Sequence, residues 1–210
     1  MLKSEGFDLW ADGYDRDVGL TEEADEYPFA GYKAVLGSIY AYICEGKGQS
    51  VLDLGCGTAA LTARLYNQGL KVSAVDFSER MLEIAREKMP AAQLVRCGIE
   101  QAPDVFSDCK FDAIVSTYAM HHLTDEQKRQ LVKRLGAMLT EKGCIYIGDV
   151  AFENEEKLRT CREQSGEEWD EDEIYFVLDQ WADLPGFNVQ FEIKSHCAGV
   201  LMIRPDADAE

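Results

Sequence analysis

Apolar and polar positions alternate along the chain in a rhythm that predicts strands separated by helices. Short, continuous apolar runs are typical of strands that are buried on both faces of a parallel sheet. They predict strands at residues 51–54, 71–76, 94–96, 111–116 and 144–150. Apolar residues at helical spacing predict helices between and around these strands, including one from Pro28 to Ile43 and one that opens at a Thr124–Gln127 capping box.

The pattern changes after the fifth strand. A charged stretch from Phe152 to Gly166 predicts a helix, and a second helix is expected from about Glu171 to Pro185. Residues 187–193 and 200–203 then read as two strands, and the polar link between them is too short for a helical crossover, so they must pair antiparallel. The predicted fold class is α/β: a Rossmann-like, open, mostly parallel sheet with helices on both faces and a C-terminal antiparallel strand pair.

Composition limits the function. A length of 210 residues with 46% hydrophobic and 29% charged residues fits one soluble domain, and neither a signal peptide nor an 18-residue apolar run is present, so a cytoplasmic location is expected. The formal net charge of -18 would repel a phosphate backbone, which makes nucleic acid an unexpected partner. The 7 cysteines are scattered without a C-x-x-C pair, and they predict neither a disulfide framework nor a zinc site.

The stretch from Val51 to Leu61 holds the clearest chemical signal. A buried strand runs into a glycine turn that opens onto a helix, with Thr58 as the expected cap. Gly55-x-Gly57-x-x-Ala60 fits a loose dinucleotide fingerprint. Asp53, two residues before the first glycine, could instead hold a cationic amino group, as an amino-acid-like ligand would require. The alternative is that Asp53 only caps backbone N–H groups of its own turn.

A second carboxylate supports an adenosine ligand of either kind. Asp76 ends the second predicted strand, where such a group can accept hydrogen bonds from both ribose hydroxyls. Met81 follows in a helix capped by Ser78, and it could pack against an adenine or simply fill the core.

The Asp-x-Gly-x-Gly pattern resembles motif I of the class I S-adenosylmethionine (SAM) dependent methyltransferases, and the resemblance covers nearly the whole chain. It implies SAM as the cofactor, S-adenosylhomocysteine (SAH) as the product, and a small-molecule acceptor. The cofactor contacts that it implies are Asp53, Gly55, Cys56, Gly57, Asp76, Phe77, Met81, Gly98, Ile99 and Ser116. An NAD(P)-dependent oxidoreductase and a non-catalytic SAM-binding protein remain as alternatives.

Two positions depart from the family pattern. The usual third glycine of the turn is Ala59, and the acid that typically contacts the adenine amino group falls on Gly98. Either Glu100, two residues on, or backbone groups at Gly98 and Ile99 would then recognise the adenine.

The acceptor site is expected where the loop after the fourth strand meets the N-terminus. Phe7, Trp10 and Tyr14 are similar to the N-terminal entry of many small-molecule methyltransferases, so residues 1–210 are expected to form one methyltransferase domain in which residues 1–45 form a lid and a helix. Tyr14, His121 and His122 are the candidate catalytic residues, although packing or capping would also explain the histidines. No metal is expected there, because adjacent side chains diverge and no cysteine or third histidine lies nearby in sequence.

Overall fold

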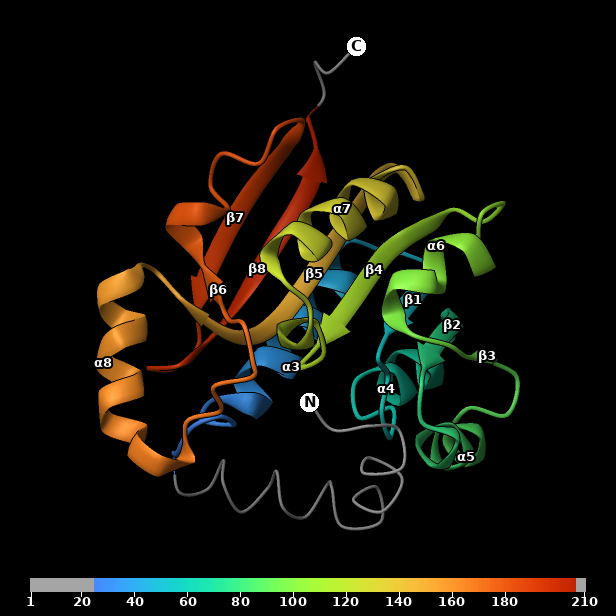
Figure 1. The fold of residues 1–210 in the computed structure, drawn as a ribbon. Helices are drawn as coiled ribbons and strands as arrows, with labels where there is room; N and C mark the ends of the chain where they lie inside the picture. Colours follow the sequence, from blue (N-terminus) through green and yellow to red (C-terminus); the bar gives the residue numbers. More distant parts are fainter. Residues whose placement is uncertain (1–24, 207–210) are drawn as a thin grey trace.

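Strand β1 (Ser50–Leu54) lies inside a sheet whose order explains where a ligand can bind. The computed structural model describes residues 25–206, and in that part of the chain the sheet has eight strands in the order β3-β2-β1-β4-β5-β8-β7, with β6 paired to β5 (Figure 1). The other strands are β2 (Lys71–Asp76), β3 (Gln93–Arg96), β4 (Phe111–Thr117), β5 (Leu139–Phe152), β6 (Phe176–Val177), β7 (Phe187–Ile193) and β8 (Ala198–Pro205).

Helices cover both faces of the sheet, and the strands are apolar on both faces for that reason. Val51 packs with the helices α3 (Tyr32–Glu45), α4 (Thr62–Asn67) and α5 (Glu79–Lys88), whereas Leu52 packs with α6 (Ala102–Val105) and α7 (Asp125–Gly136) on the other face. Both side chains are fully buried, which stabilises the fold by about 1.5 to 3 kcal/mol each. The helix α8 (Glu155–Ser165) lies beyond β5, at one end of the molecule (Figure 1).

The expected fold class is confirmed. β1 pairs in parallel with β2 and β4, β2 with β3, and β4 with β5, while β8 runs antiparallel to both β5 and β7. The expected helix starts at Ser78 and Thr124 are confirmed as well. The Ser78 hydroxyl accepts the Met81 N–H at 3.1 Å, and Thr124 and Gln127 form a reciprocal capping box.

Two expected elements are wrong. No α-helix begins near Glu171; instead, the chain is extended into β6 and then makes the short 3-10 helix η4 (Leu178–Gln180). The buried pair Phe176–Val177 joins the C-terminal end of β5 beside Ala151 and Phe152, so burial in the sheet prevails over helical periodicity. Thr58 does not cap α4, which begins only at Thr62 and has no side-chain cap.

The topology places one crevice at the carboxyl ends of the strands. β1 has β2 on one side and β4 on the other, so the connections leave β1 and β4 in opposite directions along the sheet. Ligands of open α/β sheets bind at such a switch point. The 3-10 helix η2 (Met120–His122) follows β4 there. Of the N-terminal segment predicted as lid and helix, α3 is observed and Phe7, Trp10 and Tyr14 lie outside the described residues. Within residues 25–206, no helix has the length and apolar character to cross a membrane.

Candidate active site

A cavity of about 570 Å³ opens at this switch point. Its walls come from the turn after β1, the end of β2, the loop after β3, the loop after β4, and the starts of α3 and α7. The lining residues are Tyr32, Gly55, Cys56, Gly57, Thr58, Ala60, Leu61, Asp76, Phe77, Met81, Gly98, Ile99, Glu100, Thr117, Tyr118, Ala119, His122, Leu123 and Gln127. Most of the residues predicted to contact a cofactor therefore share one cavity with one of the predicted catalytic histidines.

The glycine turn needs its glycines for two different reasons. Gly55 has a φ of 74°, and a Cβ there would lie 2.6 Å from Cβ of Ala119, so the turn and the loop after β4 can approach only without a side chain. Gly57, with a φ of 51°, would meet nothing within 4 Å, so its backbone faces open space. Ala59 takes a φ of 62°, in the region that glycine favours, which costs about 1 to 2 kcal/mol.

Asp76 holds the glycine turn in place and faces the cavity. One carboxylate oxygen accepts the Gly57 N–H at 2.9 Å, and the other accepts the Ser78 N–H at 2.8 Å. A carboxylate has about four acceptor positions, so its oxygens can accept more than one hydrogen bond each.

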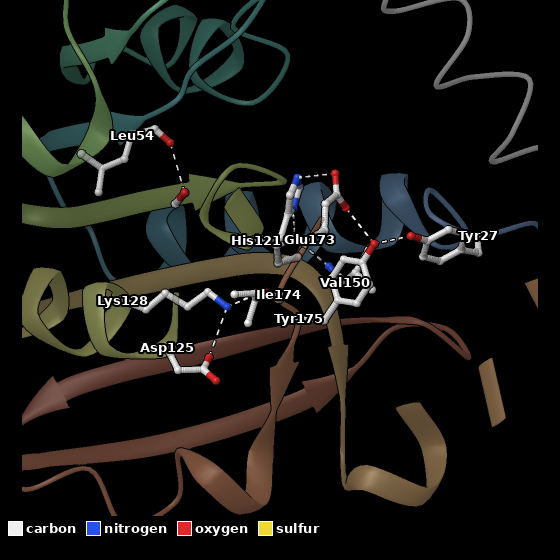
Figure 2. Close-up of polar contacts among 11 residues, drawn as sticks. Tyr27, Leu54, His121, Asp125, Lys128, Val150, Glu173, Ile174 and Tyr175 are labelled. Atoms are coloured by element: carbon white, nitrogen blue, oxygen red, sulfur yellow. Dashed lines mark hydrogen bonds and ion pairs between the residues drawn. The ribbon is translucent and has the colours of Figure 1, made fainter. Parts of the chain in front are cut away.

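Asp53 and Ser116 lie beneath the cavity and are not part of its wall. The Ser116 hydroxyl donates to the Leu54 carbonyl at 3.1 Å, an interaction within the sheet (Figure 2). Oδ2 of Asp53 accepts from the Thr62 hydroxyl at 2.9 Å, while its buried Oδ1 has no hydrogen-bond partner among the described residues. Burial raises the pKa of Asp53 to about 7, and the negative charge of Asp76 adds to the shift. A cation nearby would therefore satisfy both the oxygen and the charge.

Glu100 occupies the space that a side chain at position 98 would fill. A Cβ built on Gly98 would lie 2.6 Å from both carboxylate oxygens of Glu100. Both residues line the cavity, next to Ile99 and Phe77. An acid from position 100 thus lies next to the place where a side chain at position 98 would begin.

The two adjacent histidines have different surroundings. His121 is buried behind the cavity wall, with Nδ1 2.6 Å from Asp149 Oδ1 and Nε2 3.3 Å from Glu173 Oε1 (Figure 2). Burial acts to lower the pKa of His121, but the charge and hydrogen bond of Asp149 and the charge of Glu173 raise it overall. His122 lines the cavity, and burial, followed by the charge of His121, lowers its pKa to about 4. The surroundings of His121 therefore favour its protonated form, whereas His122 is neutral near neutral pH.

A network behind the cavity was missed by the sequence analysis. Glu173 accepts from the Tyr175 hydroxyl at 2.8 Å, and that hydroxyl also contacts the Tyr27 hydroxyl (Figure 2). The ring of Tyr27 stacks on Trp169 with 5.0 Å between centroids. Glu173 and His121 are far apart in the sequence, so no local pattern linked them.

A metal ion at this network is geometrically conceivable, since one ligand atom each of His121, His122 and Glu173 lies within 4.8 Å of the others. However, both ring nitrogens of His121 already face carboxylates, which accounts for the arrangement as an ion-paired imidazolium. The expectation that no metal binds here stays a prediction. Tyr14, the third predicted catalytic residue, lies outside the described residues, and Tyr32 and Gln127 were not predicted to line the cavity.

Comparison with known proteins identifies the family. Residues 51–143 match the model of the family described as "Methyltransferase domain". Similar curated proteins include an uncharacterized methyltransferase of Alkaliphilus oremlandii, which is 37% identical over 153 residues, covering 73% of this chain and 69% of the relative. An uncharacterized methyltransferase of Geobacillus kaustophilus is 33% identical over 196 residues, covering 88% of each chain.

Solved structures share the fold at low identity. Magnesium protoporphyrin IX methyltransferase (ChlM) from Synechocystis, solved with bound SAH, superposes with a TM-score of 0.69 at 16% identity and covers 85% of both chains. DesVI of Streptomyces venezuelae superposes with a TM-score of 0.68 at 18% identity, covering 93% of this chain and 98% of its own. Neither the oxidoreductase nor the non-catalytic alternative gains support from these relatives. The strand order, the Asp-x-Gly-x-Gly turn and the relatives together show that this chain belongs to the class I SAM-dependent methyltransferases.

Proposed function

We propose that this enzyme transfers the SAM methyl group to a small-molecule acceptor that binds against Tyr32, Tyr118 and His122. The observation that carries the proposal is the single cavity of about 570 Å³ in which the glycine turn, Asp76 and Glu100 share walls with these three side chains. This volume lies within the range of small-molecule sites, about 300 to 1,000 Å³.

The cofactor half of the cavity fits SAM residue by residue. We assign Asp76 to accept hydrogen bonds from the ribose hydroxyls, and Phe77, Met81 and Ile99 to provide apolar surface for the adenine, because all four line the cavity. We assign the Glu100 carboxylate, which lines the same cavity, as the acceptor for the adenine amino group. The unpartnered Oδ1 of Asp53, beneath the turn, favours a cationic amino group above it. Cys56 would contribute surface rather than a nucleophile, because burial raises the pKa of its thiol.

The chain has little covalent chemistry to perform. SAM supplies a methyl group on a sulfonium, which is a good leaving group, so the protein must orient the acceptor in line and exclude water. His122, which lines the cavity and is neutral near neutral pH, is positioned to contact the acceptor. Since efficient general bases have a pKa near the working pH, we assign His122 mainly to orienting the acceptor. His121 does not line the cavity, so it affects the acceptor only indirectly, by contacting and positioning His122.

Other features support a small acceptor. The formal net charge of -18 disfavours nucleic acid, and one solved neighbour is named for a porphyrin acceptor. We propose that residues 1–210 form one domain and that Phe7, Trp10 and Tyr14 cover the acceptor, with Tyr14 contributing to turnover.

The test is incubation of the enzyme with methyl-labelled SAM and a metabolite extract, followed by identification of the labelled product. We expect label in a low-molecular-weight compound, with the yield reduced in Asp76→Ala and His122→Ala but unchanged in Lys133→Ala, an exposed position on α7. Label confined to protein or nucleic acid would contradict the proposal.

A further inference from the structure

A group of three metal-ligating side chains lies outside the active-site cavity. Cys161 comes from α8, and His196 and Cys197 come from the turn between β7 and β8. One ligand atom of each residue lies within 4.8 Å of the other two. Figure 1 shows this turn reaching towards α8, so the fold joins residues that are far apart in the sequence. This separation is why the cysteine spacing alone indicated no metal site.

We propose that Cys161, His196 and Cys197 bind a zinc ion that fastens α8 to the β7–β8 turn. Two thiolates and an imidazole are the donor set that selects zinc over magnesium or calcium. Zinc bonds of about 2.3 Å to sulfur and 2.0 to 2.1 Å to nitrogen place tetrahedral ligands roughly 3.3 to 3.8 Å apart. Side-chain rotations that move each donor atom by about 1 Å would shorten the observed separations to these distances.

A second cavity gives access and a fourth ligand. It has a volume of about 400 Å³, and Cys161 and His196 both line it. Three acidic residues, Asp25, Glu26 and Glu168, line the same space. Their charges favour a cation, and either a water molecule or one of these carboxylates can complete the coordination.

The turn that carries two of the ligands is held rigid. The Ser195 hydroxyl donates to the Ala30 carbonyl at 2.7 Å and accepts the backbone N–H groups of Cys197 and Ala198 at 3.2 and 3.1 Å. The Cys197 carbonyl accepts the Ala151 N–H at 3.1 Å. A site whose ligands are positioned before binding loses less entropy when the ion arrives.

Core packing alone explains only part of this cluster. Cys161 and Cys197 are 3% and 0% exposed, as small apolar residues often are. Packing gives no reason for an exposed imidazole beside two thiols and an acidic cavity. The proposed ion would be structural: α8 leads directly to Trp169 and Glu173, which contact Tyr27 and His121 behind the active site.

The test uses the purified, reduced full-length protein after removal of metal. Zn²⁺ alone is titrated in competition with a chromogenic chelator, and Co²⁺ is used as a spectroscopic probe. We expect saturation at one ion per chain and a thiolate-to-cobalt charge-transfer band. Cys161→Ser, Cys197→Ser and His196→Ala should each weaken zinc binding by about tenfold or more.

The matched control is Cys109→Ser, which removes a partly exposed thiol elsewhere and should leave binding unchanged. The absence of a saturable site, zinc affinity retained in Cys161→Ser and Cys197→Ser, or a cobalt spectrum without the thiolate band would each overturn the proposal. The wild-type cobalt spectrum decides the matter even if a variant fails to fold. SAH affinity, measured on the same samples, tests the active site separately.

Discussion

Because Asp53 carries a buried carboxyl group, we expect the affinity for the cofactor product SAH to depend on pH. Its pKa of about 7 means that much of it is protonated in the free enzyme near neutral pH. A cationic amino group above it would favour the ionised form, so binding should release a proton. SAH affinity should then rise with pH, by up to about tenfold per unit below pH 7, and level off above it.

Calorimetry of SAH binding between about pH 6 and pH 8, in buffers of different ionisation enthalpy, measures both the affinity and the proton released. The Asp53→Asn variant should bind more weakly and lose the pH dependence in this range. Equal slopes for the two proteins would show that Asp53 does not respond to the ligand.

Gly98 and Glu100 should behave as a coupled pair. Gly98→Asp should weaken SAH binding, because the new side chain displaces the exposed Glu100 carboxylate and places a second negative charge beside it. Glu100→Gly should also weaken binding, through loss of the acceptor for the adenine amino group, by about 1.5 to 3 kcal/mol. The double variant Gly98→Asp/Glu100→Gly should recover most of the affinity, because it returns the acid to the family's usual position.

Calorimetry on the four proteins forms a double-mutant cycle, with thermal unfolding of the free proteins as a check on folding. Strictly additive losses in SAH affinity would mean that positions 98 and 100 are not coupled. An unchanged affinity in Glu100→Gly would mean that Glu100 has no part in adenine recognition.

His121 and His122 should have opposite effects on the way in which the stability of the fold changes with pH. The pKa of His122 is lowered from 6.5 to about 4 in the folded protein, so the unfolded chain binds the extra proton first. His122 therefore costs stability as the pH falls from about 6.5 towards 4. The pKa of His121 is raised, so its stabilising contribution is fully present below about 6.5 and disappears as the pH rises through its folded value.

Urea unfolding at pH 7 and at pH 5 separates the two effects. His122→Asn should lose less stability than the wild type between pH 7 and pH 5, whereas His121→Asn should lose more. Identical pH dependence in both variants would contradict the assigned charges.

The segment that leads into β6 depends on contacts that no local pattern reveals. Lys128 on α7 is fully buried, donates to the Ile174 carbonyl, and places Nζ 4.4 Å from the centroid of the Phe176 ring (Figure 2). The aliphatic part of the Lys128 side chain packs in the core, while its ammonium group holds the segment that leads into β6 by hydrogen bonding. Lys128→Met should leave the Ile174 carbonyl without its partner and destabilise the protein by about 1 to 3 kcal/mol.

Chemical denaturation of Lys128→Met, beside Lys133→Met as an exposed control on the same helix, measures the loss. A Lys128→Met variant as stable as the control would mean that the buried ammonium is not needed to hold β6.

Elements with a strong local pattern could be predicted from the sequence, and elements fixed by distant contacts could not. The buried strands and the helices capped by Ser78 and Thr124 carry their signal in neighbouring residues. The extended path into β6 follows from pairing with β5, so a helical spacing of Ile174, Leu178 and Trp181 was misleading. Likewise, Thr58 fits a cap by type, but the turn continues to Thr62 before the helix begins.

The same division applies to the site. Gly55, Gly57 and Asp76, which were predicted to contact the cofactor, line the cavity, because a strand that ends in a parallel sheet fixes where the next residues lie. Three residues that were expected to contact a ligand lie behind the cavity wall instead: Asp53, Ser116 and His121. Side-chain direction at these positions depends on partners such as Thr62 and Asp149, which come from other elements.

Across the whole molecule, the reversal of strand order between β1 and β4 creates the site. The two halves of the sheet contribute different residues to it. The half from β3 to β1 supplies the glycine turn, Asp76 and Glu100. The half from β4 onwards supplies Tyr118 and His122, with the ion-paired His121 supported from β5 and the β6 segment. Cofactor and acceptor must therefore meet above the ends of β1 and β4.

A crystal structure of the full-length enzyme with SAH tests this requirement most directly. We predict the ribose at Asp76, the adenine amino group at Glu100, and the sulfur facing the part of the cavity lined by Tyr118 and His122. SAH bound outside this cavity, or with its sulfur directed away from His122 so that no acceptor there could reach a methyl group, would contradict the account.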